Sequence, residues 1–375
     1  MTNPVLTIML VGDLVLDEPD ADPLFDLVRP VLAGADLAFG HVEVPHTDRG
    51  VESVGDIPAP AAPPANLAAI ARAGFRAVSL AGNHIHDRGT DGILDTVSGL
   101  RAAGVASAGV GASMAEARRP AIVEAKGRRV ALLSYNCVGP KAGWAGPKRS
   151  GCAPIHVISH YEMDNANPGG PPEVYTFATP ASIEAMQADI EAAKREADIV
   201  IVSQHKGLVH QPARLAMYER PVARAAIDAG ADIVFGHHAH ICKGVEIWRG
   251  KPIFHGLGNF VTITKALNVE GNDSPERKAW AIRRRELFGF TPDPDYPLYP
   301  FHPESKNAMI AVCEIAADGA VSAGFIPCWM RPTGAPQPLG DSDKGREVAA
   351  YIENITRSEK LAAQFSWADD RVRIN

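Results

Sequence analysis

Short apolar runs rich in Val and Ile alternate with helical segments along most of the chain, and this alternation limits the possible folds more than any other feature. Runs such as VLTIMLVG (5–12), RRVALLSYN (128–136) and DIVIVSQH (198–205) have the length and β-branched content of buried strands. Segments between them, such as GILDTVSGLRAAG (92–104) and TPASIEAMQADIEAAKREA (179–197), have helical spacing. This pattern predicts a layered α/β domain with a buried sheet.

Composition excludes several other classes of protein. The chain is 46% hydrophobic and 22% charged, which predicts a packed core, and its net charge of −7 argues against a nucleic-acid-binding surface. The five cysteines form no CxxC pair, as expected for buried thiols in a reducing compartment. No apolar run approaches the roughly 18 residues of a membrane span. The apolar start, VLTIMLVGDLVL, has neither a preceding basic residue nor a cleavage site, so we expect a cytoplasmic protein.

Polar residues repeatedly occur where an apolar run ends. These positions are Asp13, His41, Glu43, Asn83, His84, His205, His237, His238, His240 and Asn259. Ligands of α/β sheets bind outside the carboxyl ends of the strands, so these side chains are expected to gather in one site.

The residue types at these positions indicate metal chemistry. Imidazole, carboxylate and amide oxygen suit Zn, Fe or Mn, and no cysteine takes part. About six candidate ligands are too many for one tetrahedral zinc. They suit two ions bridged by a carboxylate and a hydroxide that attacks the substrate. Counting ligand charges leaves such a centre with about one net positive charge, so we expect a small anionic substrate.

Five segments resemble one known family: VGD (11–13), ADLAFGHVEVP (35–45), SLAGNHIHDRGTDGILDT (79–96), VSQHKG (202–207) and DAGADIVFGHHAHICKGVEIWRGKPIFHGLGNFV (228–261). The chain resembles the CapA capsule-synthesis proteins of poly-γ-glutamate synthesis, a branch of the calcineurin-like metallophosphoesterases. The resemblance implies a layered α/β/β/α sandwich with long lid-like insertions, and a metal-dependent hydrolase.

The same resemblance implies roles for individual residues. The ligands of a dinuclear centre would be Asp13, Glu43, Asn83, His205, His238 and His240. Glu43 would bridge the two ions, and His84 would act on the reacting group as an acid or a charge stabiliser. The sequence itself suggests that Asp87 either orients His84 or an adjacent ligand, or belongs to a loop or helix cap. It also suggests that His237 is structural or supports the ligands, and that Asn259 either hydrogen-bonds a ligand histidine or forms a turn.

Two departures from the family pattern concern the substrate. His41 replaces the family's usual Asn, and because residues 41 and 43 point to the same side of a strand, His41 is expected to reach the metal centre or the substrate unless the exchange is harmless. The usual HWGxE segment reads HKGLVH, which makes Lys206 and His210 candidate substrate-binding residues. The first metal site also lacks the histidine of a DxH motif, and His41 is one way to complete it.

The predicted organisation is one domain over 1–335, with insertions at about 138–178 and 264–306, and a helical C-terminal extension over 336–375. The insertions are expected to be walls or lids of the site, or oligomer contacts. The basic run ERKAWAIRRREL (276–287) is predicted to be a solvated helix face.

Three functions are compatible with the sequence. The first is a hydrolase with a dinuclear centre acting on a phosphoester or another small anionic molecule. The second is an accessory protein of poly-γ-glutamate synthesis, or an amide or cyclic-amide hydrolase on the same scaffold. The third, a binding module without activity, conflicts with the nearly complete ligand set. The expected partner is a small anionic substrate rather than nucleic acid or membrane, and homo-oligomerisation is open.

Overall fold

The fold is built around two large β-sheets, which a computed structural model describes for residues 5–53, 59–163, 170, 172–265, 268–269 and 274–375. The ten-stranded sheet has the order β19 (Phe365–Ala368), β20 (Arg371–Ile374), β17 (Val321–Met330), β16 (Asn307–Ile315), β1 (Leu6–Leu16), β2 (Leu37–Val42), β3 (Phe75–Ser79) and β4 (Ala106–Ala108), with β15 (Asn259–Ile263) beside β1 and β18 (Pro336–Pro338) beside β17. The six-stranded sheet has the order β13 (Val245–Trp248), β14 (Lys251–Phe254), β12 (Ile233–His238), β11 (Ile199–Lys206), β7 (Arg128–Asn136) and β6 (Ala121–Ala125).

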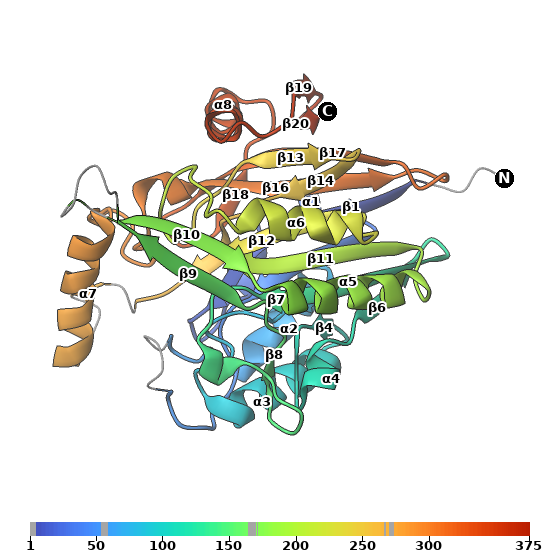
Figure 1. Ribbon diagram of the computed structural model, residues 1–375. Helices are drawn as coiled ribbons and strands as arrows, with labels where there is room; N and C mark the ends of the chain where they lie inside the picture. Colours follow the sequence, from blue (N-terminus) through green and yellow to red (C-terminus); the bar gives the residue numbers. More distant parts are fainter. Residues whose placement is uncertain (1–4, 54–58, 164–169, 171, 266–267, 270–273) are drawn as a thin grey trace.

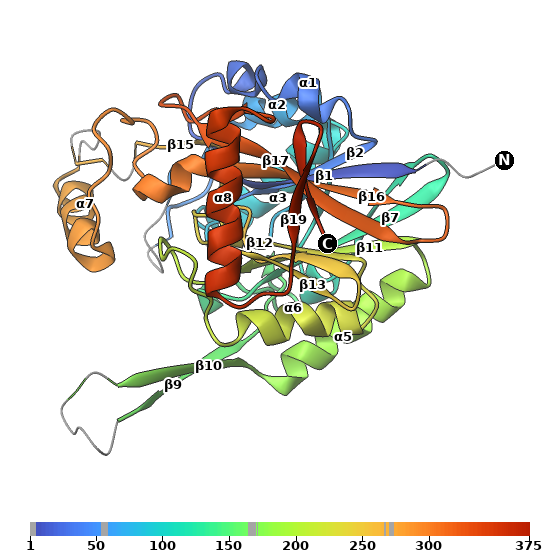
Figure 2. The same cartoon turned by 90° about the horizontal axis from the view of Figure 1, so that it is seen from above.

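Helices cover the outer faces of the two sheets. Figure 2 shows α1 (Arg29–Leu32) and α2 (Leu67–Arg72) on one side of the sheets, and α5 (Pro180–Lys194) and α6 (Glu219–Asp228) on the other. Between the sheets lies a core to which Leu10, Phe39, Ile201 and Phe235 contribute buried side chains. This arrangement confirms the predicted α/β/β/α sandwich. The other α-helices of the described residues are α3 (Gly89–Ala102), α4 (Met114–Ala117), α7 (Pro275–Phe288) and α8 (Asp343–Ser358).

Residues 21–35 (ADPLFDLVRPVLAGA) have helical spacing in the sequence but do not form one continuous helix. They form only the 3₁₀ turn η1 (Asp22–Phe25) and the single-turn helix α1. Each begins with a proline near its first position, where the missing N–H does no harm, and a proline cannot continue a preceding helix. Other 3₁₀ turns in the described chain are η2 (Pro64–Asn66), η3 (Lys141–Gly143) and η4 (Pro303–Lys306).

The two segments predicted as insertions, and the C-terminal region, have regular structure. Residues 138–178 hold β8 (Gly151–Cys152), which pairs with β5 (Val110–Gly111), and the hairpin of β9 (Val157–Glu162) and β10 (Glu173–Ala178), which extends from the body (Figure 2). Residues 264–306 hold α7 and η4. Beyond residue 335 the chain adds strands to the larger sheet besides the predicted helix. The division into a domain and an extension stays a prediction.

Parallel strands bring the predicted polar positions into rows. In the larger sheet Asp13 lies opposite His41, and His41 lies opposite Ser79. In the smaller sheet His205 lies opposite His237. The two rows face each other across the sandwich, so the site is shared between the sheets. Among the described residues, no helix combines the length and the apolar composition that a bilayer span requires.

Candidate metal centre

Asp13 is fixed in position by the backbone around it. Its N–H donates to the Gly258 carbonyl at 2.9 Å, and the Thr262 hydroxyl donates to its own carbonyl at 2.7 Å. A Cβ atom on Gly12 would lie only 2.1 Å from the Gly258 oxygen, so the residue before Asp13 must be glycine for the two segments to approach so closely. The Asp13 carboxylate is therefore held, fully buried, between two strand ends.

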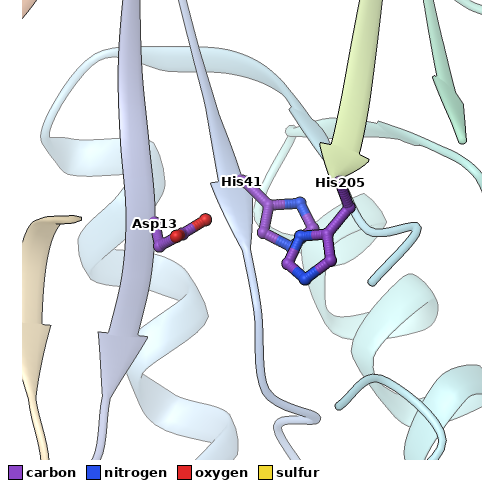
Figure 3. Close-up of side chains that lie close together, drawn as sticks. All are labelled: Asp13, His41 and His205. Carbon is purple, nitrogen blue, oxygen red and sulfur yellow. The ribbon is translucent and has the colours of Figure 1, made fainter. Parts of the chain in front are cut away.

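His41 lies beside Asp13 in the larger sheet, and His205 reaches both residues from the smaller sheet (Figure 3). One ligand atom from each of the three residues lies within 4.8 Å of the other two. The Nδ1 atom of His41 bonds to the Ser79 hydroxyl at 2.9 Å, while its Nε2 atom has no hydrogen-bond partner among the described residues. His41 is fully buried and lies outside the lining of the cavity, so it joins the potential ligands rather than the predicted substrate contacts.

A second group consists of Asp13, Glu43 and His240, again with ligand atoms within 4.8 Å of one another. Glu43 is buried, and neither of its carboxylate oxygens has a hydrogen-bond partner in the described part of the chain. The Nε2 atom of His240 lies 3.4 Å from Glu43 Oε1. Its Nδ1 atom bonds to Asn259 Oδ1 at 2.9 Å, and Asn259 Nδ2 donates to the Tyr299 hydroxyl at 2.9 Å. Asn259 therefore contacts a predicted ligand histidine, as expected.

Asn83 and His238 complete the cluster around these two groups. Asn83 Oδ1 lies 2.7 Å from His205 Nε2, and the His238 N–H donates to Asp13 Oδ2 at 3.3 Å. His238 has φ +84° and His240 has φ +53°. Such left-handed backbone is uncommon for residues other than glycine and gathers at functional sites. All six predicted ligands thus lie in one place, while the bridging role of Glu43 stays a prediction.

The electrostatics of the cluster suit a cation. Burial raises the pKa of Asp13, and burial together with the nearby Asp13 charge raises the pKa of Glu43 well above its ordinary value. Burial lowers the pKa of His41 to about 3 and that of His240 to about 4, so both rings are neutral at pH 7. Buried carboxylate oxygens without hydrogen-bond partners among the described residues, beside neutral imidazoles, are the donor set that divalent transition metals accept.

His84 stands beside the cluster and lines the cavity. Its Nδ1 atom lies 2.7 Å from Asp87 Oδ2, and the same oxygen accepts the Ala59 N–H at 2.7 Å. The side chain of Asp87 is almost fully buried, whereas that of His84 is 18% exposed. Asp87 thus contacts His84, which was one of its two predicted roles, and holds the imidazole in a fixed orientation.

Lys206 lies away from the cavity. Neighbouring residues on a strand point to opposite faces, so Lys206 points away from the side on which His205 reaches Asp13. Its ammonium group donates to the Glu219 carbonyl at 3.2 Å and lies 3.3 Å from His255 Nδ1. Lys206 is buried against α6 and does not line the cavity, and this position gives no support to the predicted substrate contact.

His210 and His237 lie behind the ligands. His210 stacks on His240 with ring centroids 5.7 Å apart and accepts a hydrogen bond from Arg284, so it supports the cavity wall from outside the lining. The predicted substrate contact of His210 stays a prediction. His237 Nδ1 lies 3.3 Å from Asp13 Oδ1, and its ring stacks on His41 at 4.7 Å. That position agrees with the predicted supporting role.

A cavity of about 820 Å³ opens onto the cluster. One wall is formed by the predicted site residues Glu43, Asn83, His84, His238 and His240, and the facing wall by α7. The basic run on α7 was predicted to be solvated, yet Trp280, Arg284 and Phe288 line the cavity. Their spacing of four residues is the available signal, because it puts an aromatic, a cation and an aromatic on one helix face.

Metal binding is the first expected result. Purified protein should contain between one and two Mn, Fe or Zn ions per chain, because two overlapping groups of buried donors share Asp13. His238→Ala and Asn83→Ala should each lower that content in elemental analysis. His160→Ala, which changes an exposed histidine of β9, is the matched control and should leave it unchanged. Protein without transition metal after growth and loading would contradict the site.

Comparison with known proteins identifies relatives of the chain. The profile of a family described as bacterial capsule synthesis protein PGA_cap matches residues 7–264. The PGA biosynthesis protein CapA of Bacillus subtilis is 27% identical over 270 residues, covering 69% of this chain and 64% of the relative. A probable polyglutamine synthesis accessory protein of Mycobacterium tuberculosis is 33% identical over 208 residues, covering 53% of this chain and 48% of the relative. The chain thus spans about half to two thirds of the length of these relatives.

Among solved structures, a putative 5'-nucleotidase from Staphylococcus aureus in complex with α-ketoglutarate aligns with 94% of this chain and 58% of its own, at 12% identity and a TM-score of 0.44. The calcineurin-like phosphoesterase YfkN from Bacillus subtilis aligns with 94% of this chain and 97% of its own, at 13% identity and a TM-score of 0.31.

Proposed function

Since this chain belongs to the bacterial capsule synthesis protein PGA_cap family, we propose that it is a metal-dependent hydrolase acting on a phosphoester or another small anionic substrate. One observation carries the proposal: buried carboxylate oxygens and imidazole nitrogens without hydrogen-bond partners among the described residues converge at the inner end of a cavity. Such unpaired polar atoms destabilise a fold unless a ligand satisfies them, so they indicate a site that is built to be filled.

The proposal assigns two ions of Mn, Fe or Zn to this cluster. The residues that would hold them are Asp13, Glu43, Asn83, His205, His238 and His240, with His41 as a further nitrogen donor beside Asp13. Bound there, the ions would draw electrons from a substrate oxygen and make water acidic at neutral pH. The protein residues contribute fixed geometry: Ser79 orients His41, and Asn259 orients His240.

His84 is the proposed proton donor to the leaving group. Its contact with the buried Asp87 carboxylate fixes the ring and assigns Nδ1 to that bond, so Nε2 is the nitrogen that would give a proton to the departing oxygen. Asp87 in turn is held by the Ala59 N–H. Because His84 is on the cavity wall and outside both donor groups, its proposed role is separate from metal binding.

A second candidate function follows from the descriptions of the relatives, which are named for PGA biosynthesis and for polyglutamine synthesis. On this reading the same site would support that synthesis or cleave a γ-glutamyl amide. The proposed location for either function is the cytoplasm, and all five cysteines are free and buried, as is usual where thiols stay reduced. The proposed partner in both cases is a small anionic molecule rather than nucleic acid or membrane.

Two assays on metal-loaded protein separate these functions. We expect p-nitrophenyl phosphate to be hydrolysed, with the activity lost on chelation and restored by Mn, Fe or Zn. The Asn83→Ala variant should show the same loss without a chelator. Turnover of γ-glutamyl-p-nitroanilide alone would favour the second function. Activity on the phosphoester that persists after chelation would contradict the first.

A further inference from the structure

We propose that Arg284 and Trp280 of α7 form an anion-recognition site that faces the donor cluster, and that the substrate joins an anionic group to an apolar body. This inference rests on the proposed function and deepens it, because it names the chemical class of the substrate. Figures 1 and 2 both show α7 standing at one margin of the molecule, beside the body formed by the sheets.

Arg284 places a cation on the lining of the cavity, near the donor cluster. Within the described chain its guanidinium makes no ion pair with a carboxylate; it donates to the imidazole of His210, and its Nε atom is buried without a partner. Burial lowers the pKa of Arg284 only to about 10, so the group is charged at neutral pH. Its charge also lowers the pKa of Glu43, so it lies within electrostatic reach of the donor cluster. A half-buried cation of this kind is a binding site for an anion.

The guanidinium is held in place before any ligand arrives. It bonds to His210 and lies over the Phe288 ring, with 5.3 Å between its central carbon and the ring centroid. His210 is itself packed edge-on against Phe288 at 5.2 Å. The helix is tied to the facing wall by the ion pair of Arg277 with Glu52 at 2.8 Å. A pre-oriented guanidinium loses little entropy on binding, which favours planar, two-point recognition of a carboxylate or phosphate.

Trp280 supplies a second donor on the same helix face. It precedes Arg284 by four residues, so the two side chains are neighbours, and both line the cavity. Its indole Nε1 atom is buried and has no hydrogen-bond partner in the described part of the chain. Indole N–H is only a donor, so this group needs an acceptor that the described residues do not supply. The Trp280 and Arg284 side chains thus bring two N–H groups without partners and one positive charge to the lining of one cavity.

The remaining lining selects the other part of the substrate. The lining of the cavity also includes apolar side chains, namely Val15, Val44, Val209, Leu287, Phe288 and Phe301. Of its other acidic residues, Glu52 is paired with Arg277, and Glu276 accepts a hydrogen bond from the Ser274 hydroxyl. A wall of this kind stabilises an aryl or alkyl group and offers little to a sugar with many hydroxyls. The expected substrates are aryl or alkyl esters of phosphate, or acids with an equally apolar body.

Phenylphosphonate tests this inference because it carries both groups and cannot be hydrolysed as an ester. Isothermal titration on metal-loaded protein should give binding that Arg284→Met weakens about ten- to a hundredfold, the value of hydrogen bonds to a charged group. The affinity of Arg284→Lys should lie between those of the wild type and Arg284→Met, because lysine keeps the positive charge but lacks the planar, two-point donor geometry of a guanidinium. Trp280→Phe keeps a ring and loses the N–H, and should weaken binding several-fold. Arg285→Met, a change at the exposed neighbour, is the matched control and should bind as the wild type does.

Methylphosphonate separates the two halves of the inference. It should bind more weakly than phenylphosphonate. Phe301→Ala should reduce the difference in affinity between the two ligands, whereas Arg284→Met should weaken the binding of both. Wild-type affinity in both Arg284 variants would overturn the inference, even if the protein hydrolyses phosphoesters normally. Conversely, Arg284-dependent binding in a protein that cleaves no phosphoester would leave the recognition site in place and remove the proposed function.

Discussion

Replacing Glu43 by Gln will lower phosphoesterase activity by orders of magnitude while the protein stays folded. Gln keeps the size of the side chain, but it removes one negative charge and turns one of two unpaired oxygens into a donor that repels a cation. The metal-free variant should be no less stable than the wild type, because a buried neutral amide costs less than a carboxylate whose pKa burial has raised. Turnover, elemental analysis and thermal unfolding measure the three effects.

The matched control for Glu43 is Glu276→Gln. This is the same substitution at an exposed carboxylate on the rim of the same cavity, in the first turn of α7. It should leave metal content and turnover close to those of the wild type. If Glu43→Gln turns over substrate as fast as this control does, Glu43 has no place in the metal centre.

His84→Ala should reduce kcat about 10²–10⁴-fold, which is the usual contribution of a general acid. Metal content should not change, because His84 belongs to neither donor group. Asp87→Asn should also lower kcat, but by less, since it weakens the hydrogen bond that orients the His84 ring. Steady-state kinetics with parallel elemental analysis distinguish lost acid catalysis from lost metal.

His86 provides the control for His84 within the same loop. It lies two residues later but outside the lining of the cavity, and it packs beside Gly143. His86→Ala should therefore leave kcat nearly unchanged. Equal losses in both variants would mean that the loop as a whole, rather than the His84 ring, matters for turnover.

The ligand cluster could be predicted from sequence because its geometry follows from local rules. Asp13, His41 and His205 each lie at or near the end of an apolar run, and parallel strands bring such ends to one edge. The rule that alternate residues share a strand face also works: His41 and Glu43 both reach the surroundings of Asp13. The same rule explains why Lys206, which follows His205 on the strand, points to the other side and away from the cavity.

The α7 wall could not be predicted in the same way. A basic helix with Trp280 and Arg284 on one face has the same pattern whether that face meets water or a cavity, and only packing against residues far away in sequence decides. Arg277 pairs with Glu52, and Arg284 bonds to His210; neither partner can be read from the helix itself. The pairing of β20 with β17 could not be predicted either, because the only strand close to β20 in the sequence with which it pairs is β19.

The position of β1 in the middle of its sheet has a consequence for protein synthesis. β1 pairs with β2 soon after it emerges from the ribosome, but its other neighbours are β15 and β16, and Asp13 contacts Gly258 and Thr262. At roughly 5–20 residues per second, this stretch takes about 10–50 s to translate. Until then, one edge of β1, which carries Asp13, lacks its partner strands, and part of the donor cluster has yet to be translated. The proposed ions would therefore enter a nearly finished molecule, and metal supply would act after translation rather than during it.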